Sequence, residues 1–459
     1  MRWVEFECAP DIAALFESAA SDGPRFLIED VPAGTAIVGA RPSQVLASKA
    51  GTTTLAAGGR EARLSGDALS ALSDLLAVAA AECRPCPAPF AGGAVGWFSY
   101  DLGRSIEVVP ETAVEDVPTP DLCLGFYDSA LCVDLRARKC TAVSWSSDES
   151  ALAYWRELAA RAPESAPPSP APVIRCAGEP VEVRCNFTRD GYLRAVRTIQ
   201  DYIRAGDVYQ VNLAQRFEAE VPAGAWALYR ALRRINPAPR SCYMEIGPLV
   251  LVSASPEVFL TYDPLTRRAV TKPIKGTRPR SGDPDEDDRL ARELAASEKD
   301  RAENVMIVDM ERNDLGRVAE YGSVEVTRLW DIEKHPNVFQ MVSTVEATLR
   351  EDCGPVDLLR ASFPGGSITG APKVRAMQII DELEPHRRGI YTGSAGFIDN
   401  RGAMDLSIVI RSFVVSGSKA WFHGGGGILI DSDPESEYQE TLDKVCGLRT
   451  ALRESGCPR

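Results

Sequence analysis

The chain lacks any long hydrophobic run. No apolar stretch among its 459 residues approaches the roughly 18 residues that a membrane-spanning helix requires. The N-terminal residues Met1 to Glu7 carry acidic side chains, where a secretory signal peptide has basic ones and an apolar core. We therefore expect no membrane partner and a cytoplasmic location.

Positive charge is also in deficit. Against 65 Asp and Glu residues stand 51 Lys and Arg residues, which gives a net charge of −14. Such a chain repels phosphate-rich surfaces, so we expect neither nucleic acid nor an anionic membrane as a partner. An anionic substrate would need a pocket that reverses this field locally with arginine, lysine, backbone amides or a metal ion.

The paired cysteines and histidines of a zinc site are missing. The 12 cysteines are scattered, and the one close pair, Cys83 and Cys86, has no second pair of Cys or His residues to complete a tetrahedron. We expect free thiols in a reducing compartment.

Composition divides the chain into two regions. Alanine and proline dominate residues 161–172, as in a linker or a long surface loop. This predicts an N-terminal region 1–160, a linker 161–182 and a C-terminal region 183–455. Apolar periodicity predicts strands at 26–28, 36–38, 94–98, 131–133, 208–217, 249–252, 390–397, 404–415 and 420–422. It predicts helices at 67–82, 190–205, 287–296, 300–311, 371–383 and 436–452. Strands and helices do not alternate regularly, so we expect an α+β fold: large antiparallel sheets packed in a sandwich, with helices outside.

The segment 271–280 places Lys275 between a proline and a glycine. These neighbours predict an irregular backbone that aims the side chain, with Thr277 and Arg278 close by. An ammonium group is a poor nucleophile, so a reactive Lys275 needs partial desolvation or a cationic neighbour. An ordinary exposed loop is the alternative interpretation of this segment alone.

Two pairs of carboxylates have helical spacing. Asp300 and Glu303 are three residues apart, and Glu437 and Glu440 repeat the arrangement at the start of another helix. Each pair alone is typical of a solvated helix face. If the helices converge, four carboxylates need a cation between them, and all-oxygen ligation suits Mg²⁺.

Two glycine clusters predict anion sites. In 364–373, amides of a turn that enters a helix, together with Lys373, could hold a carboxylate or phosphate, with Thr369 as the helix cap. The spacing is not that of a Walker A loop. The run Gly424 to Gly427 allows a ligand to approach the backbone, although a plain bulge is the alternative. Arg411, in an apolar segment predicted to be a strand, should be partly buried and therefore needs a structural carboxylate or an anionic substrate.

Taken together, these segments resemble the chorismate-utilising enzymes, a family that includes anthranilate, aminodeoxychorismate, isochorismate and salicylate synthases. The resemblance is strong from about Phe187 to Leu452 and weaker in the first third. The segments that carry it are 209–215, 254–257, 273–277, 302–304, 312–317, 366–373, 391–393, 410–412 and 431–441.

The resemblance implies roles for individual residues. Chorismate is a dianion, and its ring carboxylate is expected on Tyr391, Arg411 and the amides of Gly425 and Gly427. Mg²⁺ is expected on Glu303 and Glu440, with Asp300 and Glu437 in support. Glu257 is expected to act as the general acid and Lys275 as the nucleophile. The other substrate-binding residues that we predict are Gln210, Thr277, Ser367, Thr369 and Lys373.

Two positions separate the reactions within the family. Isochorismate and salicylate synthases have a water-activating lysine where this chain has Gln210, which disfavours both. Anthranilate synthases usually have alanine where this chain has Lys275, whereas aminodeoxychorismate synthases have lysine. The sequence therefore resembles the aminodeoxychorismate branch, with anthranilate synthase as the nearest alternative. A non-catalytic ligand-binding paralogue is a remote alternative, because Lys275, Glu257 and Arg411 are all present.

The same resemblance implies two kinds of partner. The sequence contains no glutaminase segment, so ammonia is expected from a separate glutamine amidotransferase subunit that forms a heterodimer with this chain. Leu27, Ile28 and Glu29 match the segment that binds tryptophan in anthranilate synthases, which makes tryptophan a candidate ligand. Asn304 and Gln340 depart from the family by replacing histidines.

Overall fold

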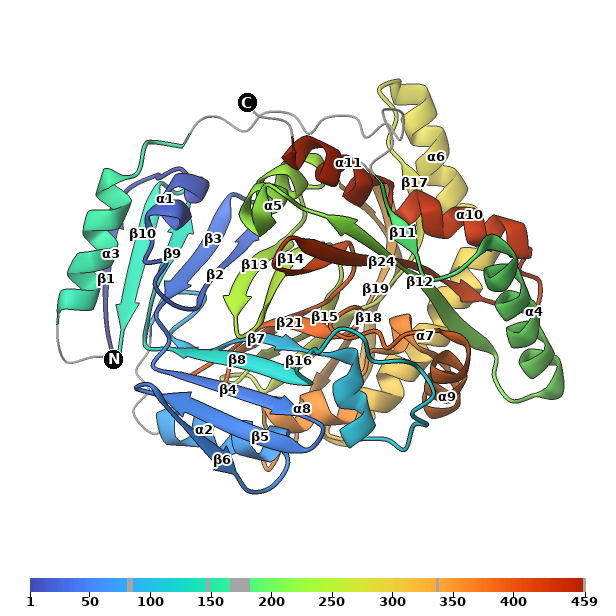
Figure 1. Cartoon of the computed structure of the whole chain (residues 1–459), viewed down its shortest axis with the longest axis horizontal. Coiled ribbons are helices and arrows are strands. Elements are labelled where there is room, and N and C mark those ends of the chain that lie inside the picture. The colour runs from blue at the N-terminus through green and yellow to red at the C-terminus, as the bar shows by residue number, and fades with distance from the viewer. Residues whose placement is uncertain (81–85, 146–148, 166–181, 336–337, 457–459) are drawn as a thin grey trace.

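Two large antiparallel sheets form the framework of the molecule, and helices surround them (Figure 1). The computed structural model describes residues 1–80, 86–145, 149–165, 182–335 and 338–456. The first sheet contains, in spatial order, β1 (Arg2–Glu7), β10 (Lys139–Ser144), β9 (Ser129–Asp134), β3 (Thr35–Ala40), β2 (Arg25–Asp30), β13 (Arg240–Ile246), β14 (Leu249–Ser255), β23 (Ser412–Ser416), β24 (Lys419–Ile428), β12 (Gln210–Glu220) and β11 (Arg184–Cys185), with β20 (Gly370–Ala371) beside β12.

The second sheet has the same size. It contains, in spatial order, β17 (Ile274–Pro279), β19 (Val338–Thr348), β16 (Arg268–Lys272), β15 (Val258–Asp263), β22 (Met404–Ile408), β21 (Ser394–Asp399), β7 (Gly93–Phe98), β8 (Leu122–Tyr127), β4 (Gln44–Lys49), β5 (Thr52–Ala57) and β6 (Arg60–Leu64), with β18 (Glu325–Lys334) paired to β19.

Both sheets contain strands from both halves of the chain. In the first sheet β2 pairs with β13, where Glu29 lies opposite Ser241, and in the second β7 pairs with β21, where Gly96 lies opposite Gly396. The regions 1–160 and 183–455 are thus interleaved in space, and their boundaries remain a prediction from the sequence. The predicted linker lies largely in 166–181, outside the described residues.

Helices cover the outer faces of the sheets. They are α1 (Ile12–Ser18), α2 (Ala68–Ala80), α3 (Ser150–Arg161), α4 (Arg189–Ala205), α5 (Gly224–Ile235), α6 (Pro284–Ala296), α7 (Glu298–Gly316), α8 (Pro355–Ser362), α9 (Lys373–Leu383), α10 (Pro434–Lys444) and α11 (Cys446–Ser455), with 3₁₀ turns η1 (Tyr100–Ser105) and η2 (Gly366–Ile368). Their ends follow from the sequence: at α4 the Thr188 side chain accepts from Gly191 N, and Gly206 ends the helix in the left-handed conformation.

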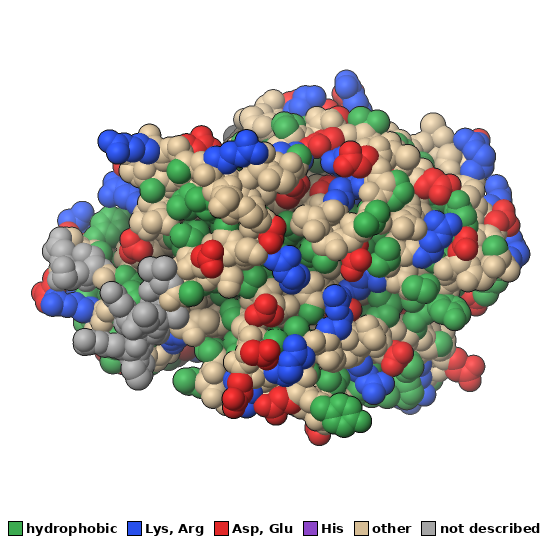
Figure 2. All heavy atoms as spheres, turned by 90° about the horizontal axis from the view of Figure 1, so that it is seen from below, with side chains coloured by type: hydrophobic (Ala, Val, Ile, Leu, Met, Phe, Trp, Pro, Cys, Tyr) green, Lys and Arg blue, Asp and Glu red, His purple; other side chains and the backbone are tan. Residues whose placement is uncertain are grey.

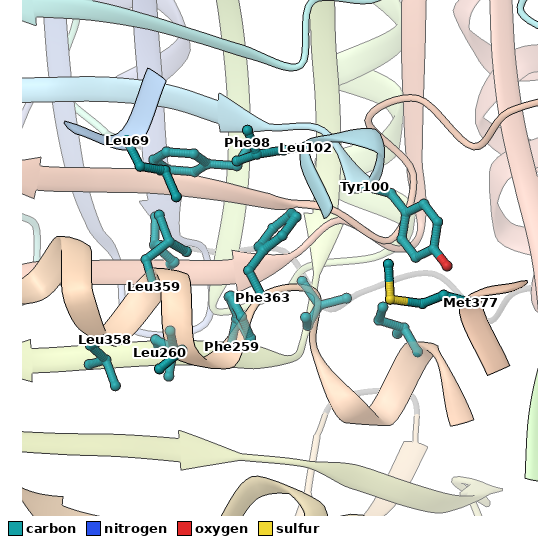
Figure 3. Close-up of a cluster of buried hydrophobic side chains, with 14 of the residues drawn as sticks. Leu69, Phe98, Tyr100, Leu102, Phe259, Leu260, Leu358, Leu359, Phe363 and Met377 are labelled. Atoms are coloured by element: carbon teal, nitrogen blue, oxygen red, sulfur yellow. The ribbon is translucent and has the colours of Figure 1, made fainter. Parts of the chain in front are cut away.

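Apolar side chains fill three layers. One cluster lies between the sheets, with Phe26 of the first sheet and Trp97 of the second both fully buried. The other two lie between each sheet and its helices. Figure 3 shows part of one, where Leu69 and Phe98 from the first quarter of the chain meet Phe259, Leu359 and Phe363. The α+β sandwich expected from the sequence is confirmed.

Several predicted boundaries were wrong. The segment 390–397 becomes a strand only at Ser394, and 404–415 is divided into β22 and β23. The predicted helix 436–452 is interrupted at Val445, which joins α10 to α11. Periodicity does not detect a change of direction inside an apolar segment, because the residues remain buried on both sides of it.

No helix of the described residues is long and apolar enough to cross a membrane. Eight described cysteines are free thiols, but Cys446 is disulfide-bonded, so the expectation of free thiols throughout was wrong. On the face seen in Figure 2, acidic and basic side chains are interspersed, so the net charge does not form one acidic surface there.

Candidate functional site

The glycine run Gly424 to Gly427 lies on β24, beyond the point where β23 accompanies it. The pairing of β24 with β23 ends at Phe422, whereas its pairing with β12 continues to the end of the strand. Ala214 of β12 lies opposite Gly425, yet its amide donates away from β24, to Glu384 at 2.9 Å. Opposed residues of an antiparallel ladder exchange both hydrogen bonds or neither. The amides of Gly425 and Gly427 therefore point away from β12. They point toward the side of β24 where β23 no longer pairs with it, and they offer two hydrogen-bond donors to an anion.

Arg411 lies in the turn between β22 and β23, not within a strand as predicted. Its φ of 51° is in the left-handed region, which is costly for a side chain of this size. Burial lowers the pKa of its guanidinium, and Arg411 takes part in none of the ion pairs found among the described residues. The sequence left two partners open for Arg411, a structural carboxylate or an anionic substrate. No structural carboxylate pairs with it in the described part of the chain.

Tyr391 lies between these two features. Its neighbour Thr392 donates its amide to Val409, two residues before Arg411. Its ring stacks on His423, just before the glycine run, with ring centroids 4.3 Å apart and an interplanar angle of 5°. Burial raises the pKa of the Tyr391 phenol, so the hydroxyl remains a hydrogen-bond donor.

Lys275 lies at an irregularity of β17. The register with β19 shifts between Ile274 and Thr277, and Gly276 has a φ of 78°. Burial lowers the pKa of the Lys275 amine, and Lys444 lowers it further, while Glu303, Glu257 and Glu440 oppose this effect. No carboxylate of the described chain lies within 4.0 Å of the amine. Lys275 is thus half-buried, unpaired and surrounded by the other predicted catalytic groups.

Glu257 is buried, with 4% of its surface exposed. Ser367 donates its hydroxyl to Glu257 Oε1 at 2.6 Å, and burial raises the pKa of the carboxyl although Ser367 and Lys275 lower it. A carboxyl with a raised pKa keeps its proton to higher pH, as a general acid requires.

Gln210 is fully buried, and neither atom of its side-chain amide has a hydrogen-bond partner among the described residues. It faces the glycine strand, because a Cβ added at Gly427 would lie 2.0 Å from Gln210 Nε2. An unsatisfied buried amide next to free backbone donors indicates a polar ligand.

The four predicted metal ligands lie in two pairs, Asp300 and Glu303 on α7 and Glu437 and Glu440 on α10. Burial raises the pKa of Glu303, and the charges of Asp300 and Glu440 raise it further. Burial and the charge of Glu440 also raise the pKa of Glu437. Asp300 and Glu437 have other partners, Arg278 Nη2 at 3.3 Å and Ser432 Oγ at 2.6 Å.

The described residues contain no cluster of three or more acidic, histidine or cysteine side chains arranged around a common point. Asp300 and Glu437 are bound by Arg278 and Ser432, so the four carboxylates do not surround one point among the described residues, and Mg²⁺ binding stays a prediction. Glu303 has no ion pair among the described residues, and Glu440 pairs only with Lys444 of its own helix. One or two carboxylates completed by waters and substrate oxygens are the donor set that Mg²⁺ prefers.

Lys444 belongs to the site but was missed from the sequence. Its amine lies 2.8 Å from Gly425 O and 2.6 Å from Glu440 Oε1. It therefore brings a positive charge to the glycine strand and contributes to the low pKa of Lys275. Its position one helical turn after Glu440 was the available signal.

Three other residues predicted to bind the substrate, Lys373, Thr369 and Thr277, are either bound to other groups of the chain or exposed. Lys373 is bound to Asp314 Oδ2 at 2.6 Å and to Ser362 O at 2.8 Å, so its charge is already balanced. Thr369 does not cap a helix: its hydroxyl donates to Gly365 O at 2.9 Å, and α9 begins only at Lys373. Thr277 is exposed on β17.

The segment predicted to bind tryptophan borders a separate cavity of about 400 Å³ between the sheets. Ile28 and Glu29 line this cavity, but the side chains of Leu27 and Glu29 lie on the opposite face of β2 from Ile28, toward α5. The Glu29 carboxylate already accepts from Tyr229 Oη at 2.5 Å and from two nitrogens of Arg233 at 2.7 Å. The Glu29 carboxylate is therefore neutralised by α5 and is not directed into the cavity.

A sequence profile of chorismate binding enzymes matches residues 23–449. The chain belongs to this family. It is 44% identical over 411 residues to aminodeoxychorismate synthase component 1 of Klebsiella aerogenes, covering 89% of this chain and 88% of that protein. It is 42% identical over 436 residues to anthranilate synthase component 1 of Thermus thermophilus, covering 93% and 92%.

Two solved structures share the fold. Anthranilate synthase component I from Streptococcus pneumoniae superposes with a TM-score of 0.78 at 30% identity, covering 90% of this chain and 92% of that one. The menaquinone-specific isochorismate synthase from Escherichia coli superposes at 0.72 and 21% identity, covering 98% and 94%. The family binds an anionic substrate, and the cationic and amide donors described above are Arg411, Lys444 and the amides of Gly425 and Gly427.

Proposed function

We propose that this chorismate-binding enzyme is an aminodeoxychorismate synthase component I, which converts chorismate and ammonia to 4-amino-4-deoxychorismate. The observation that carries the proposal is Lys275, an unpaired and partly desolvated amine beside Glu257 and Glu303. The 44% identity to the Klebsiella enzyme of that name supports it.

Substrate binding is assigned to the groups that face the open side of β24. The ring carboxylate of chorismate accepts from the amides of Gly425 and Gly427, with the Arg411 guanidinium and the Tyr391 hydroxyl beside it. Glu303 and Glu440 would hold Mg²⁺, which supplies positive charge to that carboxylate when bound. Gln210 donates its unsatisfied amide to the substrate.

The chemistry then needs a nucleophile and an acid. The Lys275 amine forms a bond to C2 of the ring, the ring double bonds shift, and the C4–O bond breaks. Glu257 gives its proton to the departing hydroxyl, which leaves as water. Ammonia adds at C4, the double bonds shift back, and Lys275 is released while the Glu257 carboxylate takes up a proton from the new ammonium group. The enolpyruvyl group is retained.

Ammonia is supplied by a separate glutamine amidotransferase subunit. The words "component 1" in the names of the relatives support a partner component. Free ammonium serves as a poorer substitute.

Product identification tests the proposal directly. The purified chain is mixed with chorismate, Mg²⁺ and an ammonium salt, and the products are separated by chromatography with and without an added aminodeoxychorismate lyase. We expect 4-amino-4-deoxychorismate alone and 4-aminobenzoate only with the lyase. Fluorescent anthranilate without any lyase would instead establish anthranilate synthase, the function that the 42% identity to the Thermus enzyme favours.

The cavity between the sheets supports a second ligand. Its volume of about 400 Å³ lies in the range of small-molecule pockets, and tryptophan is the ligand proposed for it. Titration calorimetry with L-tryptophan measures this directly, and an absence of heat at millimolar concentration would remove the assignment.

A further inference from the structure

Arg388 is a buried arginine three residues before Tyr391, in the segment between α9 and β21. Only 4% of its surface is exposed. Its charge is balanced by Glu384, the residue that follows α9, whose carboxylate accepts from Arg388 Nε at 2.9 Å and from Nη2 at 2.7 Å. Because this ion pair is complete within the chain, Arg388 does not offer a free charge to a substrate anion, as Arg411 does.

The other donors of Arg388 bind three further segments of the chain. A guanidinium group has five N–H groups, and Glu384 uses two of them. Nη2 also donates to Asn212 O at 2.8 Å, and Nη1 donates to Ile368 O at 2.9 Å and to Thr392 Oγ1 at 3.2 Å. All five N–H groups therefore have acceptors. One planar, rigid group thus sets the distances between β12, η2 and the segment that leads into β21.

Two of these contacts adjoin residues of the proposed substrate site. Ile368 follows Ser367, whose hydroxyl donates to Glu257 at 2.6 Å. Thr392 follows Tyr391, and the Thr392 hydroxyl that accepts from the guanidinium also donates to Tyr391 O at 2.6 Å. The guanidinium therefore joins the backbone beside the general acid to the backbone beside the phenol.

The third contact completes an edge of β12. On the side away from β24, β12 pairs with β20 at one end and with β11 at the other. Between these short pairings, Asn212 O accepts from Arg388, and Ala214 N donates to Glu384 at 2.9 Å. The ion pair thus takes the place of a neighbouring strand. It holds the part of β12 that lies opposite the glycine run of β24.

Tyr100 fixes Arg388 from another direction. The guanidinium carbon lies 4.8 Å from the centroid of the Tyr100 ring, within the range of a cation–π contact. The amide of Tyr100 donates to Gly389 O at 2.8 Å, and Asp101 accepts from Gly389 N at 2.9 Å. The acceptors hold the edge of the guanidinium and the ring covers its face, so the side chain is restricted to one orientation.

We propose that Arg388 is a positioning residue of the amination site. It holds the Tyr391 hydroxyl, which binds the substrate carboxylate, in a fixed geometry relative to Ser367 and Glu257, which supply the proton. The inference rests on the proposed function for the roles of Tyr391 and Glu257. It adds a residue that touches neither the substrate nor the reacting atoms but determines how both groups are placed, and such placement affects binding and rate together.

Replacing the whole ion pair separates positioning from stability. Uncharged residues of similar volume often preserve stability when they replace a buried ion pair. Arg388→Met is therefore combined with Glu384→Gln, which keeps an acceptor for Ala214 N. Arg388→Lys is a second variant, with the charge but without the planar fork. Arg387→Lys is the matched control, because this neighbouring arginine pairs instead with Glu115 at 3.3 Å.

Three quantities are measured for each variant. Thermal unfolding gives Tm, titration calorimetry with chorismate gives Kd, and the ammonium-dependent consumption of chorismate gives kcat. We expect the double variant to keep a Tm close to that of the unmodified chain, while its Kd rises and its kcat falls at least tenfold. Arg388→Lys should change both constants in the same direction by at least threefold. Arg387→Lys should leave both within twofold.

The proposal is overturned if a folded double variant keeps either Kd or kcat within twofold of the unmodified chain. A lower Tm with unchanged constants would mean that Arg388 serves stability alone. If the double variant does not fold, the same criterion is applied to Arg388→Lys. A failure of the proposed function is recognised separately, because the unmodified chain then yields no 4-amino-4-deoxychorismate with ammonium, while the Kd for chorismate still reports on Arg388.

Discussion

At the scale of single residues, the site keeps a lysine amine unpaired among acids. The Lys275 amine lies near Glu257, Glu303 and Glu440 but forms no ion pair with them. Glu440 forms its ion pair with Lys444 instead. Burial and Lys444 favour the neutral amine, which is the nucleophilic form.

Lys275→Ala removes that amine and should abolish amination. Chorismate binding should persist, because Arg411, Tyr391 and the glycine amides are untouched. Mass spectrometry of the quenched unmodified enzyme, incubated with chorismate and Mg²⁺ but without ammonia, should show an adduct on Lys275. An unmodified lysine under those conditions would contradict the covalent route.

Glu257→Gln keeps the shape of the side chain and a partner for Ser367 but cannot release a proton. We expect kcat to fall about 10²–10⁴-fold, the usual contribution of a general acid, with the Kd for chorismate changed little. The pKa of Glu257 is raised by burial, so in the unmodified enzyme the activity that depends on this proton is present at low pH and is lost as pH rises through that raised pKa. A full rate in Glu257→Gln would assign the proton to another group.

The metal assignment is tested at the same scale. Glu303→Gln and Glu440→Gln each remove one anionic oxygen donor, so we expect each to weaken Mg²⁺ binding in a calorimetric titration. Asp443→Asn, on α10 but outside the site, is the matched control. Identical titrations of Glu440→Gln and the control would remove Glu440 from the ligand set.

At the scale of elements, the loop that holds Ser367 depends on a buried acid. Glu311 of α7 accepts from Gly366 N at 3.1 Å and from Thr271 Oγ1 at 3.4 Å. Burial, with Asp314 beside it, raises the pKa of Glu311 to about 8. Because this pKa lies above that of the unfolded chain, folding favours the protonated form. The resulting stability is complete below the unfolded pKa and is lost as pH rises toward 8.

Glu311→Gln should therefore reduce the pH dependence of Tm. The free energy of unfolding changes by about 1.4 kcal/mol for each unit by which a pKa is shifted, so the loss of Tm between pH 6 and pH 9 should be smaller in the variant. Calorimetric scans at the two pH values measure it. A parallel loss in both proteins would mean that Glu311 is already charged in the folded state.

The glycine run of β24 allows a second test at this scale, which asks whether a side chain at Gly427 is tolerated. A Cβ at Gly427 would lie 2.0 Å from Gln210 Nε2, so Gly427→Ala must displace this amide. We expect kcat/KM for chorismate to fall at least tenfold. Gly282→Ala, where no atom lies within 4 Å of the added Cβ, should leave it unchanged.

The sequence predicted the chemical groups better than their surroundings. Lys275, Glu257 and the two acidic pairs stand in segments whose spacing and family resemblance identify them, and the structure places Lys275 near Glu257, Glu303 and Glu440. The turn at Arg411 could not be predicted, because both sides of it are apolar and strand-like. Lys444 was missed because a lysine four residues after a glutamate is usually a surface ion pair. Lys373 was predicted to bind the substrate because its actual partner, Asp314, is 59 residues away in the sequence and could not be recognised there.

At the scale of the whole molecule, the two regions of the chain complete each other's sheets. The buried ion pair of Glu29 with Arg233 joins them, and so do the pairings of β2 with β13 and β7 with β21. A C-terminal fragment alone would expose the edges of β13 and β21 and the apolar side chains that pack against Leu69 and Phe98 (Figure 3).

We therefore expect a fragment of residues 182–459 to show no cooperative thermal transition, although it contains every proposed catalytic residue. Co-expression with a fragment of residues 1–165 should restore one transition and the amination activity, because strands can pair across a break in the predicted linker. Circular dichroism during heating and the ammonium-dependent assay measure the two effects. A sharp transition of the C-terminal fragment alone would show that 183–455 is an independent domain and that the shared sheets are not required for its folding.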